Sequence, residues 1–223
     1  MSLDHQLAGN LAEAVALLER AGLIDYNGHV SARTENGLFA INLGASNRAA
    51  ITPADITLMD ASGEPGEGLP TPPKERYLHT AIYARRPDVG AIVHCHSTWC
   101  TMLSTCSVAY EPVFPQGSLV GDAPLFEKVA SINTLQLGTR LAEVLGEGRA
   151  ALLQSHGMLT CGRTIQEAVV LALYMEENAR RQMLALSCGR SYRLMTAEEI
   201  AETERNLRDP KLFDKAYAYY AAK

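Results

Sequence analysis

The chain has 223 residues, 47% of them hydrophobic, which is enough to bury an ordinary core, so we expect one domain over residues 1–223. The net charge is −5 and the charged residues are interspersed, so there is no basic face for nucleic acid and we exclude it as a partner. The five cysteines form no CxxC pair, so we expect no disulfide framework. The amino terminus lacks the basic and apolar regions of a leader, and no apolar run is long enough to span a bilayer. We therefore expect a soluble, cytoplasmic protein without a membrane partner.

The first third of the chain predicts a helix, several short strands and a second helix. Apolar residues recur at helical spacing over residues 3–20, and Gly22 follows as a C-terminal stop. Residues 28–60 contain short runs such as HVSAR, GLFAIN and DITLMD split by turn residues, a pattern typical of antiparallel strands. Residues 62–73 are rich in Gly and Pro and predict a surface loop. A helix is predicted next, over residues 74–86.

The rest of the chain continues the alternation of strands and helices. Residues 89–96 predict a strand, and residues 131–146 predict a short helix. Thr164 and Glu167 have the spacing of a capping box at the start of a long helix over residues 165–187. Helices and strands that alternate around one mixed sheet make an α/β layered fold the expected architecture.

Three histidines have the spacing of a metal site. Side chains two apart on a strand share a face, so His94 and His96 project together and two imidazoles can hold one ion. His156 follows a second predicted buried strand, RAALLQS, and supplies a third imidazole. Three protein ligands leave a position open for water or substrate, which is typical of a catalytic site. Taken alone, an HxH pair on an apolar strand is also compatible with ordinary core histidines.

Glu75 lies at the start of the helix predicted over residues 74–86, with His79 one turn further on the same face. A carboxylate there can act as a general acid or base beside the histidines. The alternative is a charge that only stabilises the first turn of the helix through its dipole.

The run PPKERYLHTAIYARRPDVGAIVHCHSTW followed by LLQSHGMLTCG resembles the class II aldolase and adducin family. The resemblance extends from the first helix to about Gln182 and rests on the ExxxH, RPD, HxH and HG motifs. It implies a three-layer αβα fold with a mixed, largely antiparallel sheet, and usually a homotetramer with active sites at subunit interfaces. It also implies that Glu75 is the acid/base residue and that one divalent ion per subunit, which could be Zn, Mn, Fe or Co, is bound by His94, His96 and His156.

Sugar-phosphate aldolases of this family bind phosphate through a GNxS turn, a Thr-Gly turn and a serine pair, and this chain keeps little of that pattern. The GNxS turn reads GHVS here, which places His29 and Ser31 at the substrate, and a later segment contributes Arg48. Pro73 and Lys74 stand where the serine pair would be. These side chains suit a carboxylate, which arginine can bind with two parallel hydrogen bonds. The alternative is that Arg48 and Lys74 are solvated loop charges.

The GHVSAR turn, the SNR segment and the EPVFPQGS stretch resemble the decarboxylase branch of the family, whose members act on hydroxylated aromatic or pyridine carboxylic acids. The tyrosine that the aldolases use from a neighbouring subunit, expected around residues 114–116, is missing. We therefore expect a carboxy-lyase in which the metal stabilises an enolate-like carbanion and Glu75 moves the proton. Two alternatives remain: a class II aldolase that cleaves a hydroxy-ketone or a sugar phosphate, and a non-catalytic assembly module like the adducin head.

Overall fold

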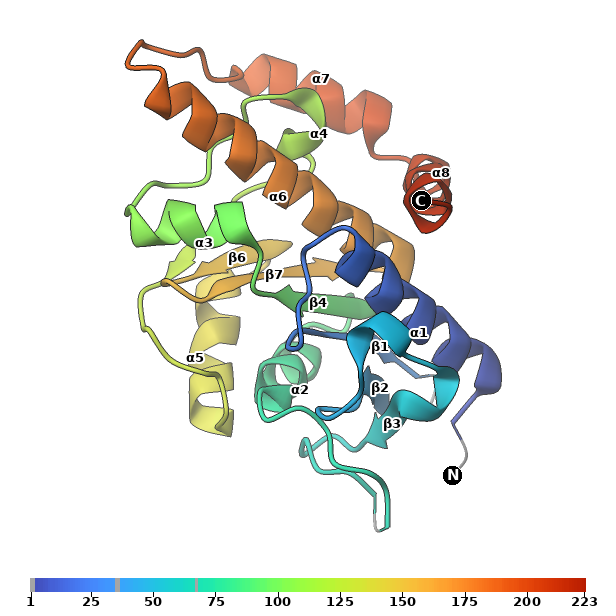
Figure 1. The fold of residues 1–223 in the computed structure, drawn as a ribbon. Coiled ribbons are helices and arrows are strands. Elements are labelled where there is room, and N and C mark those ends of the chain that lie inside the picture. Colours follow the sequence, from blue (N-terminus) through green and yellow to red (C-terminus); the bar gives the residue numbers. More distant parts are fainter. Residues whose placement is uncertain (1–2, 35–36, 67) are drawn as a thin grey trace.

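A seven-stranded sheet with helices on both faces forms the centre of the computed structural model, which describes residues 3–34, 37–66 and 68–223 (Figure 1). The strand order is β3-β2-β1-β4-β7-β6-β5, and of the paired strands only β5 and β6 run parallel. This arrangement confirms the expected αβα fold with a mixed, largely antiparallel sheet. The strands are β1 His29–Arg33, β2 Phe39–Asn42, β3 Ile56–Met59, β4 Ala91–Cys95, β5 Leu125–Phe126, β6 Ala150–Leu153 and β7 Gly157–Gly162.

The helices form the two outer layers. Helices α1 and α6 cover one face of the sheet, and α2 and α5 pack together on the other face (Figure 1). No helix in the described part of the chain combines the length and the apolar character that crossing a membrane requires. The α-helices are α1 His5–Arg20, α2 Arg76–Arg85, α3 Thr98–Thr105, α4 Pro115–Ser118, α5 Leu135–Leu145, α6 Ile165–Ser187, α7 Ala197–Leu207 and α8 Pro210–Ala221, and short 3-10 turns are η1 Arg48–Ala50 and η2 Pro53–Asp55.

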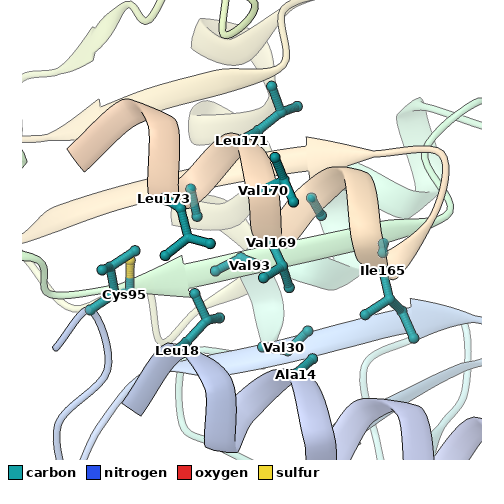
Figure 2. Packing of buried hydrophobic residues seen from close by; sticks show 14 of the residues in the cluster. Ala14, Leu18, Val30, Val93, Cys95, Ile165, Val169, Val170, Leu171 and Leu173 are labelled. Atoms are coloured by element: carbon teal, nitrogen blue, oxygen red, sulfur yellow. The ribbon is translucent and has the colours of Figure 1, made fainter. Parts of the chain in front are cut away.

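The larger apolar core lies between the sheet and the layer formed by α1 and α6 (Figure 2). Leu18 of α1, Val93 of β4 and Val169 of α6 meet there and are fully buried. Each side chain of this size stabilises the fold by about 1.5–3 kcal/mol when it leaves water. Because side chains alternate along a strand, the neighbours of Val93 face the opposite way, and Ile92 joins the second core beside α2 and α5. The same alternation directs His94 toward α2.

Most predicted elements are present, with local differences at their starts. Helix α2 begins at Arg76, so Glu75 is its N-cap residue and not part of its first turn. At the start of α6, the Thr164 side chain accepts a hydrogen bond from the Glu167 N–H at 3.1 Å. The Glu167 carboxylate accepts from the Arg163 N–H and not from Thr164, so only half of the predicted capping box forms. Within the predicted loop 62–73, residue 67 lies outside the described residues.

Candidate metal centre and active site

Four side chains from three separate segments meet at one end of the central strand β4. Glu75 precedes α2, His94 lies near the end of β4 and His96 just beyond it, and His156 lies in the turn between β6 and β7. One nitrogen or oxygen atom of each residue lies within 4.8 Å of those of the others. The structure thus brings together the three histidines and the carboxylate that the sequence singles out.

The distances between these side chains leave room for one ion. The His96 and His156 Nε2 atoms are 3.0 Å apart. Glu75 faces the imidazoles with both oxygens: Oε2 is 3.4 Å from His94 Nε2, and Oε1 is 3.5 Å from His156 Nε2. His96 Nε2 lies 3.9 Å from Glu75 Oε2. All three imidazoles therefore present the same atom, Nε2, to one common point.

A contact behind His94 fixes its ring in an orientation that suits a metal ligand. Its Nδ1 lies 2.9 Å from the Met158 carbonyl oxygen, and since a carbonyl can only accept, Nδ1 carries the hydrogen. The lone pair is then on Nε2, which is buried and has no hydrogen-bond partner among the described residues. A buried polar atom without a partner is costly, and a cation at the centre of the cluster would satisfy it. The donor set of three nitrogens and a carboxylate fits Zn, Mn, Fe or Co.

Gly157 allows His156 to approach β4. Its φ is 155°, and a Cβ atom at this position would overlap the Cys95 carbonyl. The preceding residue, Ser155, also has a positive φ of 51°. The HG motif thus forms a tight turn that only glycine fits, and this turn places the His156 ring opposite His96.

The electrostatics of the cluster keep its groups ready for a cation. Burial raises the pKa of Glu75, but the close approach of the His94 and His96 imidazoles outweighs this effect and holds the pKa below its usual range. Burial lowers the pKa of His156 to about 4, so this imidazole is neutral at pH 7. A deprotonated carboxylate and neutral imidazoles are the forms that bind metals. Glu75 is also fixed by the Ile132 backbone N–H, which donates to Oε1 at 2.8 Å.

The residues predicted to bind substrate take different places around this cluster. His29 is buried beside it, with Nε2 3.9 Å from Glu75 Oε2. Ser31 is fully buried behind His29, where its hydroxyl contacts His79 and Tyr83 and does not face solvent.

Arg48 and Lys74, the other two residues predicted to bind substrate, differ from each other in burial. Arg48 is buried, and its Nε and Nη1 donate to the carbonyl oxygens of Gly28, Leu43 and Ser46. Arg48 thus links the residue that precedes β1 to the loop that follows β2. The Lys74 side chain is exposed.

Two contacts of the site were missed by sequence reasoning. The Ile132 contact comes from a backbone N–H, which no residue type signals. Tyr83 could have been found, because Glu75, His79 and Tyr83 are spaced four residues apart and follow one face of α2.

A three-layer α/β fold that positions three imidazoles and a carboxylate at the end of a central strand is typical of a metal-dependent enzyme. Residues 9–183 match the family model described as the class II aldolase and adducin N-terminal domain, and the chain belongs to this family. Its relatives include lyases of two kinds, so the family assignment supports a lyase and leaves the type of lyase open.

Relatives of both kinds cover most of the chain. A 3,4-dihydroxyphthalate decarboxylase from Terrabacter sp. (strain DBF63) is 27% identical over 206 residues, which cover 86% of this chain and 86% of that protein. The L-fuculose phosphate aldolase of Escherichia coli (strain K12) is 29% identical over 203 residues, which cover 88% and 92%. A solved structure of L-fuculose 1-phosphate aldolase superposes with a TM-score of 0.85 at 25% identity, covering 93% of this chain and 98% of that chain.

Proposed function

We propose that the chain is a metal-dependent carboxy-lyase that removes carbon dioxide from a hydroxylated aromatic or pyridine carboxylic acid. The observation that carries the proposal is the position of His29, whose imidazole lies beside Glu75 where sugar-phosphate aldolases have a small asparagine. The similarity to a decarboxylase of a dihydroxylated aromatic diacid supports the same substrate class. His94, His96 and His156 would hold the ion.

Glu75 is the residue that moves the proton in this proposal. Its carboxylate accepts the proton of the substrate hydroxyl and returns one proton to the ring carbon that the carboxyl group leaves. One carbon–carbon bond breaks, one carbon–hydrogen bond forms, and the product oxygen takes up one proton from solvent. The divalent ion, when bound, supplies Lewis-acid stabilisation of the negative charge that develops on the substrate.

A second candidate is aldol cleavage of a hydroxy-ketone or a sugar phosphate, favoured by the similarity to L-fuculose phosphate aldolase. It needs the same cluster of imidazoles and carboxylate. The replacement of small phosphate-binding donors by His29 and Lys74, and the absence of tyrosine from residues 114–116, favour the carboxy-lyase. A non-catalytic assembly module has no physical need for three convergent imidazoles.

The proposal includes a homotetramer with active sites at subunit interfaces. The family resemblance supports it, as does the aromatic carboxyl-terminal helix α8, on which Tyr219 is 59% exposed. Light scattering during turnover tests it, and a fully active monomer would contradict it.

The experiment that tests the function uses metal-loaded protein and a panel of hydroxybenzoates, hydroxyphthalates and sugar phosphates. Carbon dioxide and aldehyde are measured for each compound. We expect carbon dioxide from at least one hydroxyaromatic acid and no aldehyde from the phosphates. Release of aldehyde from a sugar phosphate, without carbon dioxide from any acid, would replace the proposal by the aldolase.

A further inference from the structure

A buried row of polar side chains leads from Glu75 into the protein. His29 Nδ1 lies 2.6 Å from His79 Nε2, and His79 Nδ1 lies 2.7 Å from Ser31 Oγ. The row ends at Tyr83, whose hydroxyl is 2.9 Å from Ser31 Oγ. All four side chains are buried. Together with the His29 Nε2 atom that faces Glu75, they form a continuous path, which we term the His29 relay.

The relay follows from the geometry of two elements. His29 and Ser31 are two residues apart on β1, so they share the face directed at α2. His79 and Tyr83 are four residues apart on α2, so they share the face directed at β1. A strand face and a helix face that each carry two polar groups thus pair beside the apolar side chains of the second core.

The hydrogens of the relay have one arrangement in which every buried donor has an acceptor. Burial raises the pKa of Tyr83, so its hydroxyl keeps its hydrogen, and Ser31 Oγ is its hydrogen-bond partner in the described chain. Tyr83 therefore donates to Ser31, and the Ser31 hydroxyl donates to His79 Nδ1. His79 then carries its hydrogen on Nε2 and donates it to His29 Nδ1. The opposite direction would leave the Tyr83 hydroxyl as a buried donor without an acceptor.

We propose that Tyr83, Ser31 and His79 are positioning residues that hold His29 in the tautomer with its hydrogen on Nε2. In this form His29 donates a hydrogen bond to an oxygen of the substrate, and on the proposed function that oxygen belongs to a carboxylate. The same tautomer leaves no lone pair on Nε2, so His29 is not a metal ligand although it lies beside the cluster. The relay thereby separates a substrate-binding imidazole from the three metal-binding ones.

Neutron diffraction tests the tautomer directly on wild-type protein. Crystals of the perdeuterated, zinc-loaded protein should show deuterium on Nε2 of His29 and on Nε2 of His79, and none on Nδ1 of either ring. Deuterium on Nδ1 of His29 would overturn the proposal. This result does not depend on turnover, so it stands apart from any failure to detect carbon dioxide.

A double-mutant cycle tests whether His79 acts through His29. The probe is phthalate, a dicarboxylate without the reactive hydroxyl, and its Kd for zinc-loaded protein is measured by calorimetry. His29→Met and His79→Leu should each weaken binding by about tenfold, the order of one lost hydrogen bond to a charged group. The double variant should be no weaker than His29→Met alone, because His79 has no further route to the ligand.

Two further measurements accompany the double-mutant cycle. His29→Gln, whose amide offers a donor in place of Nε2–H, should recover most of the affinity that His29→Met loses. Every variant should keep the zinc content of the wild type, which checks that the cluster is intact. Additive losses in the double variant, zinc loss in His29→Met, or no phthalate binding by the wild type would each overturn the proposal.

Discussion

Replacing His96 with alanine removes one of the three imidazoles while leaving the core intact, because His96 lies just beyond β4 and is only partly buried. Its Nε2 atom is 3.0 Å from His156 Nε2 and 3.9 Å from Glu75 Oε2, so the variant loses one donor from a set of four. Metal at about 100 times its Kd stabilises a folded protein by about 2.7 kcal/mol. A chain of this size gains roughly 2–4 °C in Tm per kcal/mol. We therefore expect zinc to raise the Tm of the wild type by about 5–11 °C and that of His96→Ala far less.

The assay is thermal unfolding with excess zinc and with a chelator. His5→Ala is the matched control, because His5 is exposed at the start of α1 and outside the cluster. His5→Ala should show the full zinc-dependent rise in Tm. Equal rises in Tm for wild type and His96→Ala, or equal metal content of the two by elemental analysis, would refute the metal assignment.

Three further predictions address the acid/base residue, the loop and pH. Glu75→Gln should keep the metal, but its kcat should fall by a factor of about 10²–10⁴, because an amide cannot accept and return a proton. Near-normal turnover would mean that Glu75 only stabilises the start of α2. Arg48→Ala should lower the free energy of unfolding, measured in urea, by about 2–4 kcal/mol, because the substitution leaves buried carbonyl oxygens without a donor. If Arg48 also binds a carboxylate of the substrate, kcat/KM for an aromatic diacid should fall by more than the loss of folded protein explains. An unchanged free energy of unfolding would make Arg48 a solvated charge. Burial lowers the pKa of His79 to about 3 and that of His156 to about 4, so the unfolded chain binds more protons than the folded one between about pH 6.5 and pH 4. The metal-free protein should therefore have a lower free energy of unfolding at pH 5 than at pH 7. Equal free energies of unfolding at the two pH values would contradict this prediction.

The elements that the sequence predicts well are those whose signals are local. Helix α6 has the predicted bounds because Thr164 caps its start and the apolar spacing continues to its end. The approach of His94 to His96 follows from strand alternation alone. The family motifs then connect these two residues with Glu75 and His156, which are distant in sequence.

The elements that were missed depend on distant partners. Helix α3 begins where the Glu176 carboxylate, from the middle of α6, accepts hydrogen bonds from the N–H groups of Trp99 and Cys100. Strand β7 begins and ends at a glycine, and it is held in the sheet because it pairs with both β4 and β6. Neither partner can be read from the local sequence.

The candidate site shows the same division between local and distant signals. The identity of the clustered residues is visible in the sequence, but the bond from the Ile132 N–H to Glu75 is not. The GHVS segment, which stands where sugar-phosphate aldolases have a GNxS turn, predicts that His29 and Ser31 both contact the substrate. In the structure Ser31 lies behind His29, further from the cluster. That order depends on the packing of α2 against β1, a tertiary contact.

The most direct test of the proposed carboxy-lyase is the mass spectrum of the product formed from 3,4-dihydroxyphthalate in D₂O by metal-loaded protein. We expect an aromatic product that has lost carbon dioxide and gained one non-exchangeable deuterium at the vacated ring carbon. Glu75→Gln should form this product far more slowly. Unchanged dihydroxyphthalate, in a preparation that cleaves L-fuculose 1-phosphate to an aldehyde, would contradict the proposed carboxy-lyase activity.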